Sequence, residues 1–385
     1  AAKASRMKLD FDGKAFSGPA WDTLVAEGKA AQFFLLGEEH GIAENPKLAA
    51  QLFETLAKDG YSKLVIEVSP PMAAALDESA RKGMAGLTTQ LLSPGASAAF
   101  FTMQQEAEML MRVRAAVPAD QQAFWGVDYE VGGDRLLIGK LKAMPKPKAA
   151  EEALATLEAA SEAAWAKYAT EKNPGLIFTF SGDPALVRAV RDVWPDCNAE
   201  ASRILTTLEE TLEINRLWVT GEGFDSNVRR STFIRTNFLA HWQAERAAGR
   251  MPKVFAKMGS SHLMRGRNST ETYDLGSLVP ELATMAGVKT LQVAIMPGAT
   301  SQVAVFDPVA WSYTPASAKD GYTKGLEPLY AAAFEDGFTL INLRLLRPIL
   351  GGGRTDVEPE LMRTVYGYDF LLLMTGSTPS SNLKP

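Results

Sequence analysis

"FFLLGEEHG" (33–41) decides the fold: an apolar run of strand length stops at Gly37 and is followed at once by Glu38, Glu39 and His40. Such a run predicts a buried β-strand, and a glycine at its end lets the chain bend and expose the next side chains. If residues 38–40 stay extended, Glu38 and His40 point to the same side, because side chains alternate along a strand. The sequence therefore predicts a carboxylate beside an imidazole.

A second Gly-x-x-His motif follows another apolar run. "KVFAKMGSSH" (253–262) reaches Gly259 and His262 with the spacing of "GEEH" (37–40), in a chain that has only three histidines. The third, His241, lies in the helical pattern "FLAHWQAER" beside Trp242, where we expect it to pack in a core or interface. The repeated motif marks His40 and His262 as the candidates for a functional site.

Strand and helix patterns alternate through the first third of the chain. Apolar runs at 32–37, 63–68 and 123–128 are separated by helical patterns near 46–59 and 100–116. This alternation predicts β-α units on a largely parallel sheet.

The middle of the chain is helical, and strand patterns return after it, at 253–259, 289–296, 338–343 and 368–374. We therefore predict an α/β fold with a largely parallel or mixed central sheet flanked by helices and carrying a helical insert. The glycine-rich stretch "LGGGRTDVEPE" (350–360) is typical of a loop. The expected division is residues 1–147 for the first half of the α/β domain, 148–249 for the insert and 250–385 for the second half.

Acidic residues close two further predicted strands. Glu67 ends "KLVIE" and Asp128 ends "AFWGVD". Ligands of open α/β sheets bind outside the carboxyl ends of the strands. We therefore expect one site to contain Glu67, Asp128 and the two motif histidines.

These residue types are compatible with two kinds of chemistry. His40, His262 and Glu67 could ligate a divalent transition metal such as Mn, Co, Zn or Fe, whose bound water would lose a proton to Glu38 or Glu67. Without a metal, a histidine oriented by a carboxylate could act as a general base. In the second case the nucleophile is water or one of the serines at 260 and 261.

Substrate contacts are expected from polar residues near the motifs. Asp128 lies at a strand end, Arg230 and Asn237 share one predicted helix, and Arg265 follows the second motif. Guanidinium groups recognise carboxylates and phosphates in a bidentate manner. Arg230 and Arg265 are therefore candidates to hold an anionic part of a substrate.

The order "LLGEEHG", "KLVIEV" and "VFAKMGSSHLMRG" resembles the superfamily of Tiki proteases, TraB and GumN proteins, haem-binding ChaN lipoproteins and erythromycin-esterase-like proteins. The resemblance spans roughly residues 30–130 and 225–297. It implies an α/β sheet on which the two Gly-x-x-His motifs face each other, with His40 and His262 paired and Glu38 and Glu67 as the acidic residues. "RRSTFIRTNF" is similar to the arginine and asparagine helix of the esterase-like members, which points to Arg230 and Asn237.

The resemblance implies one of two functions. The first is a hydrolase of ester or amide bonds, with or without a metal ion, acting on a small molecule or a peptide. The alternative is an exported protein of ChaN type that binds haem or another small ligand without catalysis. The first motif, Gly-Glu-Glu-His-Gly, is one residue shorter than the Gly-Glu-x-x-His-Gly typical of erythromycin esterases and lacks the Asp-Asn that usually follows the ChaN histidine.

Composition narrows the possible partners. The chain has 385 residues and a formal net charge of -5 without long runs of one sign, which argues against nucleic-acid binding. No apolar stretch approaches the roughly 18 residues that predict a transmembrane helix. The single cysteine, Cys197, excludes an internal disulfide. The alanine at the start of the sequence favours an exported protein, periplasmic or secreted, although a cytoplasmic location also fits. No sequence pattern indicates an oligomeric state.

Overall fold

The structure is a computed structural model and describes residues 1–318, 322–351 and 357–385. Residues 352–356 of the stretch that was expected to form a glycine-rich loop lie outside the described residues. Among the residues described, no helix is both long enough and apolar enough to cross a bilayer.

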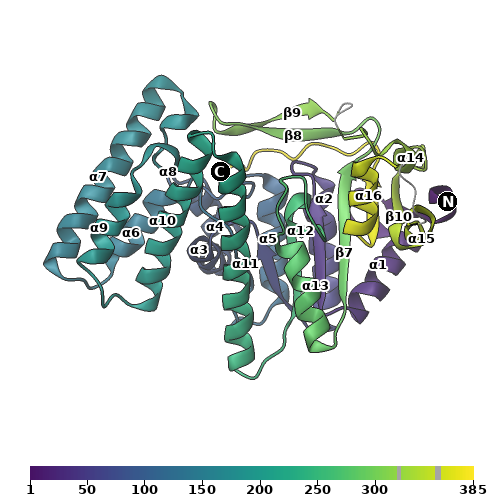
Figure 1. The fold of residues 1–385 in the computed structure, drawn as a ribbon, viewed down its shortest axis with the longest axis horizontal. Helices are drawn as coiled ribbons and strands as arrows, with labels where there is room; N and C mark the ends of the chain where they lie inside the picture. The colour runs from purple at the N-terminus through teal and green to yellow at the C-terminus, as the bar shows by residue number, and fades with distance from the viewer. Residues whose placement is uncertain (319–321, 352–356) are drawn as a thin grey trace.

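A mixed sheet forms the centre of the molecule (Figure 1). Six neighbouring strands are parallel, and the strands at one edge run antiparallel to their neighbours. The α/β prediction is thereby confirmed. In the described residues the strand order across the sheet is β2 (Phe16–Ser17), β1 (Arg6–Phe11), β10 (Phe338–Asn342), β11 (Phe370–Met374), β7 (Thr290–Pro297), β3 (Phe33–Glu38), β6 (Lys253–Gly259), β4 (Tyr61–Ile66) and β5 (Phe124–Gly126).

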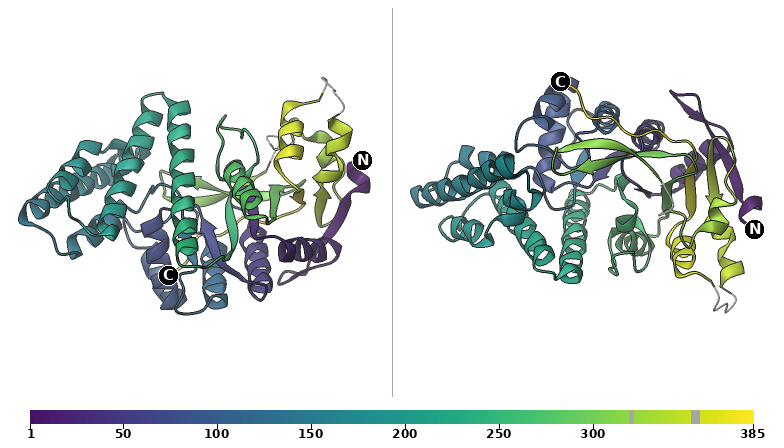
Figure 2. Two further views of the ribbon diagram at one scale, coloured as in Figure 1. Left: turned by 60° about the horizontal axis from the view of Figure 1, so that its bottom comes forward. Right: turned by 90° about the horizontal axis from the view of Figure 1, so that it is seen from above.

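The apolar runs form strands because helices cover both faces of the sheet (Figure 2). Along β3, Phe34 and Leu36 join a core with one set of helices, and Phe33 and Leu35 pack on the opposite set. The first face is covered by α1 (Pro19–Ala30), α2 (Glu44–Ala57), α3 (Pro70–Arg81), α4 (Met84–Leu91) and α5 (Gln104–Ala116), and the second by α11 (Gly223–Ala247) and α13 (Leu275–Ala286).

A group of helices beside the sheet has a core of its own, at the left in Figure 1. It consists of α6 (Asp134–Ala143), α7 (Lys148–Glu171), α8 (Phe178–Ser181), α9 (Pro184–Asp192) and α10 (Ala199–Val219). Within the range predicted as the insert, α11 packs on the sheet through Phe238 and Trp242. The division at residues 147 and 249 stays a prediction.

Several elements were not expected from the sequence. The short strands β1 and β2 and the hairpin of β8 (Gln302–Asp307) and β9 (Ser312–Ser317) have weak apolar patterns. The run expected at 123–128 is a strand only at Phe124–Gly126. The remaining short helices are α12 (Ser260–Leu263), α14 (Glu327–Tyr330), α15 (Arg347–Leu350) and α16 (Pro359–Gly367), with 3-10 turns at Ala2–Ala4, Pro174–Leu176 and Leu343–Leu345.

The β8–β9 hairpin lies against the loop that follows His40. The Ala304 amide donates to the Gly41 carbonyl over 2.9 Å. A Cβ on Gly41 would lie 2.1 Å from the Ala304 oxygen, and the φ of Gly41 is +86°. Only glycine fits this close approach, so Gly41 lets the hairpin fix the chain directly after the first motif.

Candidate active site

Four neighbouring strands end at one pocket. The order β3, β6, β4, β5 places the carboxyl ends of these strands side by side, and Glu38 pairs in register with Gly259. The pocket has a volume of about 390 Å³. It is lined by all five residues predicted from the strand ends and by one predicted arginine: Glu38, His40, Glu67, Asp128, His262 and Arg230.

His40 lies between two carboxylates. Its Nδ1 is 3.0 Å from Glu38 Oε1, and its Nε2 is 3.5 Å from Glu67 Oε2. The ring of Phe100 stacks on the imidazole with centroids 3.7 Å apart and planes inclined by 10°. The Glu39 carboxylate contacts neither His40 nor Glu38 and accepts a hydrogen bond from the Tyr322 hydroxyl over 2.9 Å, at the edge of the same pocket. The expected alternation of side chains over 38–40 is therefore present.

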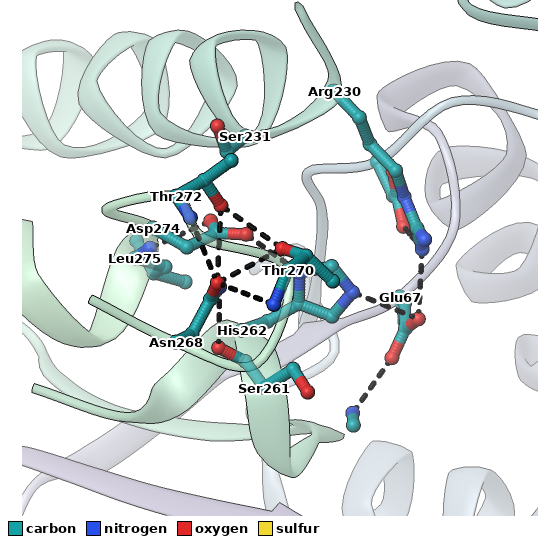
Figure 3. A network of polar contacts seen from close by, with 12 residues as sticks. Glu67, Arg230, Ser231, Ser261, His262, Asn268, Thr270, Thr272, Asp274 and Leu275 are labelled. Atoms are coloured by element: carbon teal, nitrogen blue, oxygen red, sulfur yellow. Dashed lines mark hydrogen bonds and ion pairs between the residues drawn. The ribbon is translucent and has the colours of Figure 1, made fainter. Parts of the chain in front are cut away.

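His262 repeats this arrangement from the other side (Figure 3). Its Nδ1 is 2.6 Å from Asp274 Oδ2, and its Nε2 is 3.4 Å from Glu67 Oε1. Asp274 is fixed because it caps α13, where it accepts from the Leu275 amide over 2.6 Å. Each histidine therefore has one nitrogen held by its own carboxylate and the other directed at Glu67.

Glu67 is the centre of the site and is only 7% exposed. Besides the two histidines, the Gly259 amide contacts its Oε2 over 2.7 Å and Arg230 Nη2 contacts its Oε1 over 2.9 Å. Burial raises the pKa of Glu67, but His262 and His40 outweigh it and hold the pKa well below its usual range. Glu67 is therefore ionised at neutral pH.

The two histidines are cationic in this arrangement. Burial lowers the pKa of His40, but Glu67 and Glu38 outweigh it and raise the value to about 10. Burial and Arg230 lower the pKa of His262, but Asp274 and Glu67 raise it to about 10. Each imidazolium can donate a proton, and once neutral each is a strong base.

Arg230 bridges the carboxylates on the far side of the pocket. Its Nε and Nη2 lie 3.0 and 2.5 Å from the two oxygens of Asp128, and its Cζ lies 4.8 Å from the centre of the Tyr129 ring. Glu67, Asp128 and His262 each offer one possible metal-ligand atom, all within 4.8 Å of one another. The guanidinium contacts both carboxylates of this trio.

A buried ion cluster lies beneath Glu38 and was not predicted. Lys257 Nζ is 2.6 Å from Glu38 Oε1 and 2.7 Å from Glu106 Oε1, and its side chain is 3% exposed. Burial raises the pKa of Glu38, but Lys257 and His40 outweigh it and lower it. Burial raises the pKa of Glu106 to about 7. A lone lysine inside the apolar run "VFAKMG" is the sequence signal that could have found this cluster.

Three polar residues considered from the sequence lie outside the pocket lining. Asn237 donates to the Val127 carbonyl over 2.9 Å, and Arg265 donates to Asp369 over 2.7 Å. His241 lies 3.0 Å from the Gly126 carbonyl and stacks on Trp125. Asn237 and His241 thus support the loop that carries Asp128, and substrate binding by Asn237 and Arg265 stays a prediction.

The arrangement of strands, helices and site can be compared with solved structures. A histidine-to-asparagine mutant of an erythromycin esterase, solved in its open conformation, superposes with a TM-score of 0.63 at 14% identity over 98% of each chain. The chain has the erythromycin esterase fold. A Bacillus cereus protein shares this fold with a TM-score of 0.62 at 15% identity, over 100% of this chain and 97% of that one.

A succinoglycan biosynthesis protein also superposes on this chain, with a TM-score of 0.58 at 12% identity over 100% of this chain and 97% of that one. In sequence, the chain matches no protein-family model and no curated protein. The three structural matches confirm, at the level of the fold, the family resemblance that was drawn from the two motifs.

Proposed function

We propose that the chain is a hydrolase that uses an activated water molecule to cleave an ester or amide bond in a small molecule or peptide. The observation that carries the proposal is the pair of histidines that are each held at Nδ1 by their own carboxylate and whose Nε2 atoms both lie beside Glu67. A histidine oriented through Nδ1 by a carboxylate presents Nε2 for proton transfer. The similarity of fold to an erythromycin esterase supports the same class of reaction.

The proposed reaction needs two proton transfers. Water attacks the carbonyl carbon while His40 Nε2 takes one of its protons, and Glu38 stabilises the resulting imidazolium. The tetrahedral intermediate then breaks its bond to the alcohol or amine, which leaves with a proton from His262. His40 returns its proton to His262 through solvent or along Glu67, which lies within 3.5 Å of both rings.

Water is a better candidate for the nucleophile than a serine. Ser260 and Ser261 line the pocket, but the Ser261 hydroxyl pairs with Ser269 over 2.7 Å. In the described part of the chain, neither serine hydroxyl forms a hydrogen bond to His40 or His262. A serine nucleophile requires such a contact for activation.

The donor set does not fit a divalent metal ion. Arg230, which stays protonated in proteins, lies 2.9 Å from Glu67 and 2.5 Å from Asp128. A cation ligated by these carboxylates would meet the guanidinium at close range and displace the two ion pairs. The proposed reaction therefore uses no metal ion.

Haem is also a poor fit to this pocket. His40 and His262 direct both ring nitrogens at carboxylates, and the lining includes Glu38, Glu67 and Asp128. Haem needs an axial His, Cys, Met or Tyr ligand and apolar walls for its macrocycle, and a lining with this many carboxylates offers few such walls. The ligand-binding alternative stays a hypothesis that the experiment below separates from hydrolysis.

The test is a substrate screen with a parallel ligand titration. Purified protein is incubated with a panel of carboxylic esters, lactones and peptide amides, and products are followed by mass spectrometry. We expect release of an acid from at least one ester or amide class. A saturable Soret shift on titration with hemin, together with no hydrolysis across the panel, would replace the proposal by the ligand-binding alternative.

A further inference from the structure

A second cavity lies behind the wall that carries Phe100. Its volume is about 680 Å³, within the range of roughly 300–1,000 Å³ typical of small-molecule sites. The two cavities share this wall, because Phe100 and Val131 line the pocket at His40 while Ser97 and Gly132 line the second cavity. The catalytic scheme above makes no use of this space.

Three aromatic rings form one side of the second cavity. Trp165 and Tyr168 come from α7, and Trp311 comes from the turn between β8 and β9. The ring of Trp311 lies edge-to-face with Trp165 at 5.4 Å and with Tyr168 at 5.9 Å between centroids. Such contacts make a rigid apolar wall against which a flat ring can pack.

The hairpin turn holds Trp311 in an unusual conformation. Its φ is 52°, in the left-handed region that a bulky residue rarely adopts. The indole Nε1 donates to Ser97 Oγ over 3.3 Å, and the Tyr168 hydroxyl donates to the Pro308 carbonyl over 2.9 Å. A strained residue fixed by its neighbours in this way is a common feature of ligand-binding sites.

Arg135 supplies a positive charge that no carboxylate approaches within ion-pair distance in the described residues. Its Cζ lies 4.6 Å from the centre of the Trp165 ring, and its Nε is buried without a hydrogen-bond partner. Across residues 1–318, 322–351 and 357–385, Arg135 takes part in no ion pair. Glu162 also lines the cavity, but it is exposed, so solvent screens its charge more strongly than that of the half-buried Arg135.

Two glycines make room for this arrangement. A Cβ on Gly95 would lie 2.2 Å from Arg135 Nε, and a Cβ on Gly132 would lie 2.9 Å from the Trp311 ring. Any larger residue at either position would displace the arginine or the tryptophan. The chain therefore accommodates both groups at the wall of one cavity.

We propose that this cavity binds a small molecule that combines an aromatic or other flat apolar ring with one acidic group. The ring packs against Trp311 and Trp165, and the acidic group pairs with Arg135. The proposal does not depend on the chemistry at His40.

The probe for the test is 1-anilinonaphthalene-8-sulfonate, a ring system with one sulfonate whose fluorescence rises in apolar surroundings. N-phenyl-1-naphthylamine, which lacks the sulfonate, is the uncharged control. Wild-type protein should bind the sulfonate probe saturably at one site. Arg135→Met should weaken that binding about tenfold, the effect of roughly 1.4 kcal/mol, and leave binding of the uncharged probe unchanged.

Three variants keep the test specific. Trp311→Ala should weaken binding of both probes, and His40→Ala should change neither, because it lies in the other pocket. Arg203→Met removes an exposed arginine of α10 that does not line the cavity and should also bind both probes as the wild type does.

Circular dichroism verifies that each variant is folded, and Arg135→Gln replaces Arg135→Met if the latter is not. The proposal is overturned if wild type shows no saturable binding, or if Arg135 and Trp311 variants bind the sulfonate probe as tightly as wild type.

Discussion

Lys257 Nζ lies 2.6 Å from Glu38 Oε1, in a part of the sheet where the two side chains are 3% and 1% exposed. A buried lysine is costly unless its charge is paired. Here the pair continues to His40, whose Nδ1 contacts the same Glu38 oxygen over 3.0 Å. The ion pair thus supports both the fold and the histidine to which we assign the general-base role.

Lys257→Met should lower the free energy of unfolding by about 3–5 kcal/mol, because it leaves Glu106 buried without a cation and Glu38 with only His40 as its partner. Urea denaturation followed by circular dichroism measures the change. Adding Glu106→Gln should restore part of the loss, since only one buried carboxylate then remains. The matched control is Lys140→Met, at a lysine 3.8 Å from the largely exposed Glu78, where we expect a change of at most about 0.5 kcal/mol. Equal stabilities for Lys257→Met and Lys140→Met would refute this role.

Hydrolysis should become faster as the pH rises. Burial lowers the pKa of His40, but Glu67 and Glu38 raise it to about 10, so the neutral form that accepts a proton is scarce at pH 7. The neutral fraction, and with it kcat/KM, should increase about tenfold per pH unit between roughly pH 7 and 9. His262, with a pKa also raised to about 10, stays protonated over this range.

The pH profile of Glu67→Gln supplies the control for this explanation. Loss of the Glu67 charge lowers the pKa of His40, so the residual activity should rise at lower pH than in wild type. A wild-type profile that is flat from pH 6 to 9 would be incompatible with a base of raised pKa.

Arg230→Met should bind a divalent metal ion more tightly than the wild type does. The substitution frees Glu67 and Asp128, which with His262 offer ligand atoms within 4.8 Å of one another. Elemental analysis after incubation with Zn²⁺ should show near-stoichiometric zinc in the variant and only traces in wild type. Arg229→Met on the same helix, whose arginine pairs with Glu210 at 2.8 Å, is the matched control and should resemble wild type. Stoichiometric Mn, Co, Zn or Fe in wild-type protein would contradict our metal-free scheme.

The sequence predicted the parts of the site that follow from local periodicity. Glu38 and His40 lie on the same side because they are two residues apart at a strand end. Glu67 directly follows a buried strand, and Asp128 lies two residues after another. The parallel sheet then brings these ends together. Strand order itself was not predictable, because the placement of β6 between β3 and β4 depends on packing between distant segments.

The supporting residues escaped prediction for a similar reason. Asp274 lies twelve positions after His262, and Glu106 lies 151 positions before Lys257, so no local pattern links the partners. Phe100 was expected within the helix near 100–116, but that helix begins at Gln104, and Phe100 reaches His40 from the preceding turn with a φ of 64°. Arg265 is close to the second motif in sequence, yet it turns to Asp369 instead of the pocket.

The most direct test of the central claim is the rate at which His40→Ala hydrolyses the best substrate found for the wild-type protein, compared with His241→Gln as a matched control. His241 does not line the pocket, and a glutamine amide can keep its contact with the Gly126 carbonyl, so this variant should retain most of the wild-type activity. We predict that His40→Ala loses activity by at least about 100-fold, the usual contribution of a general base, while its circular dichroism spectrum stays that of the wild type. A folded His40→Ala protein with the wild-type rate would contradict the account.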